Sequence, residues 1–124
     1  MTIPTDLSYT DQHEWLKVDG DNARVGVTAS ACEALGDVVF IELPAIGSKL
    51  SAGEPCGELE STKSVSDLFS PANGEVVEIN QAVVDNPQLL NDDPFGTGWL
   101  FVMRLEGEAP LLDATAYAKL TTEG

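Results

Sequence analysis

The sequence has 124 residues, of which 43% are hydrophobic and 22% charged, a composition typical of one globular domain and unlike a disordered chain. Its 21 acidic and six basic residues give a net charge of −15, which argues against binding to nucleic acid or to an anionic membrane surface. No apolar run approaches the roughly 20 residues of a membrane span. Residues 1–11 lack the Lys and Arg of a targeting segment. From the chain length we expect one domain over residues 1–124.

Short apolar runs separated by 11 glycines and seven prolines favour many short strands over long helices. Residues 13–18 alternate in polarity and predict a strand, and the turn at residues 19–22 joins it to a partner strand at 23–27 in a hairpin. The remaining predicted strands are, in chain order, residues 38–43, 49–50, 55–59, 75–80 and 99–105. The predicted fold class is therefore mostly β.

Two helices are predicted beside these strands. Thr28 can cap a short helix over residues 29–35, and Gly36 ends it because glycine readily adopts the left-handed conformation found after helices. Residues 111–120 have apolar side chains at helical spacing and predict a C-terminal helix. Residues 86–98 are rich in Pro, Gly, Asn and Asp, which predicts a long loop with room for one turn of helix.

An internal similarity relates two of the predicted strands. Residues 36–42 (GDVVFIE) align with residues 74–80 (GEVVEIN), with four of seven positions identical and Asp37 replaced by the like-charged Glu75. Lys63 lies between the two copies. A fold built from two related β halves, joined by an exposed turn, would place this lysine at the tip of that turn.

Most catalytic motifs are absent from the sequence. It has one histidine, His13, and neither a glycine-rich phosphate loop nor a G-x-S-x-G nucleophile elbow. Cys32 and Cys56 match no disulfide framework or zinc pattern, so we interpret both as small, partly buried hydrophobic residues. Asp92 and Asp93 stand before a proline, which is typical of a turn, and no metal site is predicted. We therefore expect a protein that is not itself an enzyme.

Lys63 is the strongest candidate for a functional residue. The segment ESTKSVSD surrounds it with small and acidic residues, and no other basic residue lies between Lys49 and Arg104. A lysine that is modified needs an accessible amine on a flexible side chain, and small neighbours leave room for a modifying enzyme. The alternative is a solvated lysine beside Glu60 and Asp67, an exposed pairing that contributes less than about 1 kcal/mol. Local features alone leave both interpretations open.

Several motifs in the chain together resemble one known family. The segment ESTKSVSDLFSPANGEV (residues 60–76) resembles the lipoyl-lysine hairpin of the glycine cleavage system H-protein. Motifs of that family follow in order along the chain: YTDQHEW (9–15), VGVT (25–28), LGDVVFIELP (35–44), NDDPFGTGWL (91–100) and LLDATAY (111–117). The resemblance implies a hybrid barrel-sandwich fold of the lipoyl- and biotinyl-carrier type, with the lysine on a hairpin turn.

The resemblance also implies a carrier function with a covalent cofactor. Lipoic acid would be bound to Lys63 as N6-lipoyllysine, attached by lipoate-attaching enzymes. A pyridoxal-phosphate glycine decarboxylase would transfer an aminomethyl group to the lipoyl disulfide, and an aminomethyltransferase would pass its methylene to tetrahydrofolate and release ammonia. A flavin-dependent (FAD) dihydrolipoyl dehydrogenase would reoxidise the dithiol. We expect a bacterial, cytoplasmic monomer; a mature mitochondrial chain without its presequence is the alternative.

A shielding pocket is a further implication of the resemblance. In the family the loaded arm folds back into a cleft, and Glu14 and Asp67 match positions that can bind the amine of the carried group. A carboxylate would stabilise an ammonium group through a charge-assisted hydrogen bond. His13 is a candidate for the lining of the same cleft. The alternative for each carboxylate is a solvated surface position, and for His13 a packed residue at the edge of the sheet.

The sequence departs from the family pattern at four positions. Thr62 and Ser64 flank Lys63 where the family usually has Val and Ala, and both are small enough for modification to proceed. Ala29 and Cys32 stand where the family usually has an acidic residue and Gln. The last two changes fall on the predicted short helix, so they bear on partner docking and not on the carrier function.

Rival functions differ in the residues that they require. Biotin carrier domains favour Met on both sides of the lysine, but the two methionines here are Met1 and Met103. Lipoyl domains of 2-oxoacid dehydrogenases usually have Asp directly before the lysine and lack the HEW and DPFGTGW segments. An H-like protein that relays lipoyl groups to other enzymes, and an unmodified binding module, stay open as alternatives.

Overall fold

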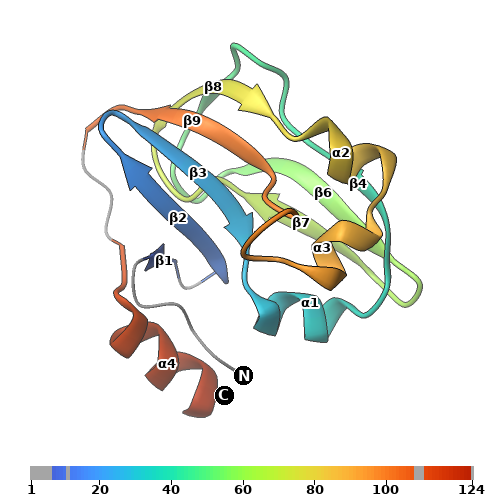
Figure 1. Cartoon of the computed structure of the whole chain (residues 1–124). Helices are drawn as coiled ribbons and strands as arrows, with labels where there is room; N and C mark the ends of the chain where they lie inside the picture. Colours follow the sequence, from blue (N-terminus) through green and yellow to red (C-terminus); the bar gives the residue numbers. More distant parts are fainter. Residues whose placement is uncertain (1–6, 11, 108–110, 124) are drawn as a thin grey trace.

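The computed structural model describes residues 7–10, 12–107 and 111–123, and this part of the chain forms two β-sheets and four short helices (Figure 1). In chain order the elements are β1 (Ser8–Tyr9), β2 (Glu14–Asp19), β3 (Asn22–Val27), α1 (Ala29–Leu35), β4 (Val38–Glu42), β5 (Lys49–Leu50), β6 (Pro55–Ser61), β7 (Val65–Phe69), β8 (Gly74–Ile79), α2 (Gln81–Asp85), α3 (Gln88–Asp92), β9 (Phe101–Leu105) and α4 (Ala114–Glu123). The mostly β fold class is confirmed.

The two sheets differ in size and share one core. One sheet has six strands in the order β1-β2-β3-β9-β8-β5, and the other has three in the order β4-β6-β7, with antiparallel pairing throughout. One cluster of buried side chains draws on both, including Val25 and Phe101 from the large sheet and Ile41, Leu59 and Leu68 from the small one. This sandwich of two sheets around a common apolar core is the predicted barrel-sandwich architecture.

The predicted hairpin at residues 13–27 is confirmed, with slightly different strand ends. β2 and β3 pair from Glu14↔Val27 to Asp19↔Asn22, so only Gly20 and one further residue form the turn. Gly20 has a φ of 64°, in the left-handed region that glycine adopts at no steric cost. β2 begins one residue later than predicted because His13 has a φ of 65°, which is incompatible with an extended strand.

β2 separates two clusters of buried side chains. Leu16 belongs to the core between the sheets, whereas its neighbour Trp15 belongs to a second, largely aromatic cluster with Tyr9 and Tyr117. Successive strand residues point to opposite faces of a sheet. Trp15 and Leu16 therefore show that the two clusters lie on opposite faces of the large sheet. Helix α4 contacts β1 and supplies Tyr117 to the second cluster.

Helix α1 matches its predicted bounds, and α4 does not. The Ala31 N–H donates to Thr28 Oγ1 at 3.3 Å, which is the predicted cap, and Gly36 follows with a φ of 82°. The predicted start of the C-terminal helix at residue 111 is wrong. Leu112 exchanges two backbone hydrogen bonds with Tyr9, at 2.7 and 2.6 Å, and the Ala116 N–H donates to Asp113 Oδ1 at 2.8 Å. The helix can begin only after this bridge and cap, at Ala114.

The segment between β8 and β9 is more helical than predicted. Helix α2 lies in residues 81–85, for which no element is predicted, directly after the predicted strand that ends at Asn80. Asn80 instead caps α2: its Oδ1 accepts from the Ala82 N–H at 3.2 Å. Helix α3 lies within the predicted loop at residues 86–98 and corresponds to the one turn of helix expected there. No helix in the described part of the chain has the length and apolar character needed to cross a membrane.

The internal similarity corresponds to equivalent strands in the two sheets. Its first copy forms β4 in the small sheet, and its second forms β8 in the large one. The matching residues Val38 and Val76 are both buried in the common core. The two copies therefore contribute equivalent inward-facing side chains from opposite sides of the sandwich, and the segment between them contains the hairpin of β6 and β7.

We expect Asn80→Ala to lower the free energy of unfolding by about 1–3 kcal/mol, measured by urea denaturation. Asn80 Nδ2 donates to the carbonyl oxygens of Thr97 (2.9 Å) and Trp99 (2.7 Å), which would both lose this donor. The exposed neighbour Gln81→Ala is the control and should change stability by less than about 0.5 kcal/mol. Equal stability of the two variants would contradict this function of Asn80.

Candidate functional site

Lys63 lies in the turn between β6 and β7. The β6–β7 hairpin has its turn at the lower right of Figure 1. The side chain of Ser61 organises the turn, because its Oγ accepts hydrogen bonds from the backbone N–H of Lys63 (3.3 Å) and of Ser64 (3.1 Å). The Ser61 N–H also donates to the Ser64 carbonyl at 2.8 Å. The turn is therefore stabilised by its backbone and one serine, and the Lys63 side chain is left exposed.

The tip of this hairpin rests on the connection between α1 and β4. The Thr62 N–H donates to the Asp37 carbonyl at 3.1 Å. Asn91 fixes that connection, because its Oδ1 accepts from Val38 N–H at 2.9 Å and its Nδ2 donates to the Gly36 carbonyl at 2.8 Å. A Cβ on Gly36 would lie 3.3 Å from Cε of Lys63, so the lysine side chain passes directly over this glycine.

The amine of Lys63 is not engaged in the ion pair that the alternative interpretation requires. None of the ion pairs among the described residues involves Lys63; they involve Lys49 and Arg104. Glu60 lies opposite Val65 in the hairpin, and Asp67 lies opposite Glu58. An exposed and unpaired primary amine at the tip of a defined turn has the accessibility that covalent modification requires.

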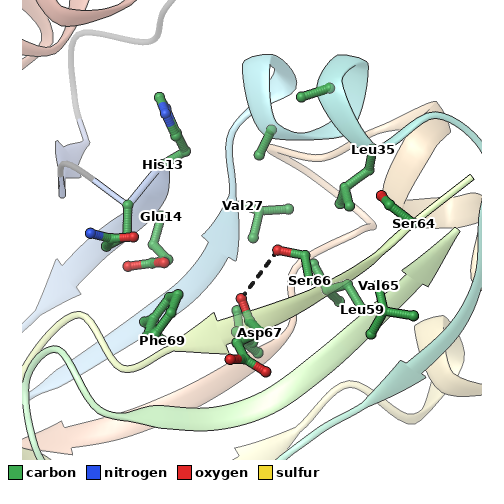
Figure 2. A pocket seen from close by; sticks show the side chains of 14 residues that line it. His13, Glu14, Val27, Leu35, Leu59, Ser64, Val65, Ser66, Asp67 and Phe69 are labelled. Carbon is green, nitrogen blue, oxygen red and sulfur yellow. Dashed lines mark hydrogen bonds between the residues drawn. The ribbon is translucent and has the colours of Figure 1, made fainter.

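A cleft of about 380 Å³ lies beside the hairpin (Figure 2). This volume lies within the range of about 300–1,000 Å³ that is common for small-molecule sites. The cleft is lined by residues 12–14, Val27, Ala31, Ala34, Leu35, Leu59 and residues 64–69. Its lining begins at Ser64, the residue that follows Lys63, so a group attached to the lysine would have an apolar-walled cavity next to it.

Glu14 provides a buried carboxylate in this cleft. It is the first residue of β2 and only 2% exposed, and Figure 2 shows its side chain directed into the cavity. The Thr10 hydroxyl donates to Glu14 Oε1 at 2.7 Å, and the Glu14 backbone N–H donates to the same hydroxyl at 3.3 Å. A buried carboxylate is costly unless it is hydrogen-bonded, and Thr10 supplies such a bond while orienting the group.

His13 lies at the rim of the same cleft. Its Nδ1 is 2.7 Å from the hydroxyl of Tyr117, and its carbonyl accepts from the Thr28 N–H at 3.0 Å. Among the described residues it is the one non-glycine residue with a positive φ. The structure thus brings His13 and Glu14 together at one cavity.

Asp67 lines the cleft, but its carboxylate lies on another face of β7. Strand alternation places it on the outer face with Val65, which is 59% exposed, whereas Leu68 is 1% exposed and faces the core. Figure 2 shows the Asp67 carboxylate pointing away from the carboxylate of Glu14. Ser66 occupies the inward-facing position beside it, and its hydroxyl donates to the Asp67 carbonyl at 3.4 Å.

Four residues of this region were not singled out from the sequence: Thr10, Ser66, Asn91 and Tyr117. Each acts through a contact with a residue in another segment or through strand alternation, and none has a local sequence signal. Thr10 and Asn91 do lie inside motifs that match the family, YTDQHEW and NDDPFGTGWL, but those motifs assign them no contact.

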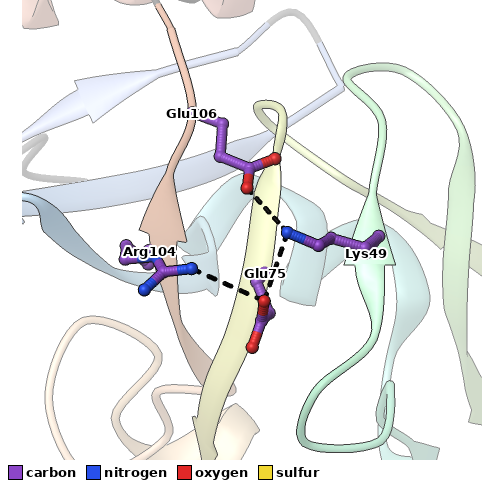
Figure 3. A network of polar contacts seen from close by, with 4 residues as sticks. All are labelled: Lys49, Glu75, Arg104 and Glu106. Atoms are coloured by element: carbon purple, nitrogen blue, oxygen red, sulfur yellow. Dashed lines mark hydrogen bonds and ion pairs between the residues drawn. The ribbon is translucent and has the colours of Figure 1, made fainter.

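Four charged residues of the large sheet and its edge form a network of ion pairs. Lys49 lies 3.2 Å from Glu75 and 2.7 Å from Glu106, and Arg104 lies 3.6 Å from Glu75 (Figure 3). The hydrogen bond between Lys49 and Glu106 raises the pKa of Lys49 and lowers the pKa of Glu106. This exposed network joins β5, β8 and the end of β9 in the large sheet, whereas Lys63 belongs to the hairpin of the small sheet.

Cys32 is buried and Cys56 is half-buried, and neither thiol is reactive. Burial raises the pKa of both Cys32 and Cys56 to about 12, so both thiols are protonated at neutral pH and are weak nucleophiles. Cys32 Sγ contacts the Leu90 carbonyl at 3.5 Å. Within the described ranges, no group of three His, Cys, Asp or Glu side chains gathers as a metal site would require.

Comparisons with known proteins agree on one family. A family model described as "Glycine cleavage H-protein" matches residues 7–124. A "Glycine cleavage system H protein" from Beutenbergia cavernae is 57% identical over 122 residues, covering 98% of each chain, and one from Thermobifida fusca is 53% identical over 98% of this chain and 97% of that one. The crystal structure of a glycine cleavage system H protein from Mycobacterium marinum superposes with a TM-score of 0.92 at 49% identity, covering 97% of this chain and 99% of that chain.

Proposed function

This chain belongs to the glycine cleavage H-protein family, and from that premise we propose that it is a single-domain lipoyl carrier with lipoic acid bound as an amide to Lys63 Nζ. The observation that supports this most directly is the placement of Lys63. Its amine is exposed and unpaired at the tip of the β6–β7 hairpin, next to an apolar-walled cleft with a buried carboxylate.

The residues around Lys63 fit such a group. The neighbours Thr62 and Ser64 are small, and the turn is stabilised by Ser61, so a modifying enzyme can approach the lysine without disturbing the fold. Amide formation removes the positive charge of the lysine. When bound, lipoic acid would supply a reducible disulfide at the end of a flexible arm, as an acceptor for the aminomethyl group. The protein itself provides tethering and orientation.

The cleft would shield the carried amine from water. Val27, Leu35 and Leu59 give the cleft apolar walls, against which the arm would displace solvent. The Glu14 carboxylate, oriented by Thr10, would accept a charge-assisted hydrogen bond from the ammonium group. His13 would close the rim next to Glu14. Asp67 would add negative charge at the hairpin without touching the amine, because its side chain lies on the outer face.

The proposed partners are those that the family implies. They are glycine decarboxylase, aminomethyltransferase, dihydrolipoyl dehydrogenase and a lipoate-attaching enzyme. With a net charge of −15, the chain would meet basic patches on these partners. A tethered arm has a high local concentration at each partner's active site while the complex lasts, so the carrier needs no catalytic residues of its own.

Glycine–bicarbonate exchange by glycine decarboxylase tests the carrier function. We expect the lipoylated wild-type chain to support exchange and Lys63→Arg to leave it at background, because arginine has no amine that can form the amide. The control Lys17→Arg, at an exposed position on β2, should exchange like wild type. If the lipoylated wild-type chain fails to support exchange, the protein is a lipoyl relay instead; an unmodified binding module would carry no lipoyl group at all.

Release of the aminomethyl group from the loaded protein tests the shielding function of Glu14. We expect Glu14→Gln to accelerate hydrolysis about tenfold or more, because a hydrogen bond to a charged group is worth about 1.5–3 kcal/mol. Asp67→Asn should change the rate less than about threefold, as its exposed carboxylate acts only through a screened charge. The control is Glu33→Gln, on the exposed side of α1. Identical rates for wild type and Glu14→Gln would refute the shielding.

A further inference from the structure

The hydroxyl group of Tyr117 joins two segments that are far apart in the sequence. Tyr117 lies in α4, is 1% exposed, and has its hydroxyl 2.7 Å from Nδ1 of His13 and 2.7 Å from Oγ1 of Thr28. His13 directly precedes β2, and Thr28 directly precedes α1. A single buried hydroxyl from the C-terminal helix therefore bonds to the starts of two different elements.

Those two elements form opposite walls of the cleft. His13 and Glu14 line one side, and the α1 residues Ala31, Ala34 and Leu35 line the other. Figure 2 shows His13 and Leu35 on opposite sides of the cavity. A backbone hydrogen bond from Thr28 N–H to the His13 carbonyl, at 3.0 Å, already connects the two walls, and the Tyr117 hydroxyl adds a second connection between the side chains of the same two residues.

The ring of Tyr117 and its hydroxyl perform separable functions. The ring stacks on Tyr9 with centroids 4.7 Å apart and an interplanar angle of 11°, which accounts for its packing in the aromatic cluster. Phenylalanine would preserve that stacking. Within Tyr117 it is the hydroxyl that bonds to both walls, so its function can be tested while the ring and its edge contact with His13 are retained.

The backbone conformation of His13 links its side-chain contact with Tyr117 to the orientation of Glu14. With a φ of 65°, His13 is in the left-handed region, where a non-glycine residue persists only if its surroundings favour it. Its N–H donates to the Thr10 carbonyl at 3.2 Å, and its ring contacts Tyr117. Any relaxation of His13 would reorient the next residue, which is the buried Glu14.

The hydrogen bonds can form a directed chain. Thr28 Oγ1 accepts from the Ala31 N–H as the cap of α1, and its own proton can be donated to the Tyr117 oxygen. Tyr117 can then donate to Nδ1 of a neutral His13, which places the ring proton on Nε2. Burial raises the pKa of Tyr117, so its hydroxyl retains this proton at neutral pH.

We propose that Tyr117 is a positioning residue that fixes the two walls of the cleft relative to each other, so that helix α4 controls how tightly the cleft encloses the carried amine. The effect on the carried amine rests on the proposed carrier function. The structural part of the proposal concerns the apo chain alone: without the hydroxyl, His13 loses its fixed tautomer and the rim next to Glu14 loosens.

Tyr117→Phe tests this positioning function, with Thr97→Val as the control that removes a hydroxyl outside the cleft lining. We expect hydrolysis of the loaded Tyr117→Phe protein to rise about two- to tenfold, the equivalent of one hydrogen bond. In the unloaded protein, the ¹⁵N NMR shifts of the His13 ring should change from a single Nε2–H tautomer to a mixture. The control should show wild-type hydrolysis and wild-type His13 shifts.

Thr28 provides a second variant pair, should Tyr117→Phe fold poorly. Thr28→Val should shift the His13 signals in the same direction but by less, because the Tyr117 hydroxyl remains and loses only the partner that fixes it. Thr28→Ser, which retains the hydroxyl, should restore the wild-type spectrum. Unchanged His13 shifts in both Tyr117→Phe and Thr28→Val would overturn the proposal. If Glu14→Gln accelerates hydrolysis and Tyr117→Phe does not, the positioning function fails alone. If neither variant accelerates hydrolysis, the proposed shielding fails, and the positioning by Tyr117 then has no effect on the carried amine.

Discussion

The register of the β6–β7 hairpin is the constraint on which the site depends. Leu59 and Leu68 are 3% and 1% exposed, and burying each side chain contributes roughly 1.5–3 kcal/mol. Because side chains alternate along a strand, a slip of one residue would turn both leucines toward solvent. The observed register, with Leu59 opposite Ser66, leaves residues 62–64 for the turn and so determines that Lys63 is at its tip. It also directs Ser66 inward and Asp67 outward.

The cleft arises where three segments meet that are remote in sequence: residues 12–14, helix α1, and the hairpin with its turn. None of them forms a cavity alone. The hairpin is supported from below by Asn91 through the connection between α1 and β4, and the opposite rim is supported by Tyr117 through His13 and Thr28. Both supports are single polar side chains: Asn91 makes two hydrogen bonds within one connection, and Tyr117 bonds to two separate segments. A fold built mainly on apolar packing thus uses a few buried polar groups to fix the geometry around its exposed lysine.

Local patterns predicted the elements whose causes are local. The β2–β3 hairpin follows from alternation and a glycine turn, and α1 follows from Thr28 and Gly36. The start of α4 was misplaced because the pairing of Leu112 with Tyr9 joins chain ends that no local window contains. Lys63 stood out from its neighbours, whereas Glu14, His13 and Asp67 entered only through family resemblance. The outward position of Asp67 could not be foreseen, since β7 had not been predicted as a strand. Likewise, the contact between His13 and Tyr117 spans 104 residues and leaves no trace in spacing.

The central claim is that Lys63 bears a covalent lipoyl group, and the mass of the protein purified from cells that make lipoate tests it most directly. The account predicts an intact mass increased by one lipoyl group, located by peptide mapping on the fragment with Lys63 and lost in Lys63→Arg. An unmodified Lys63, in cells whose other lipoyl proteins are fully modified, would contradict the account.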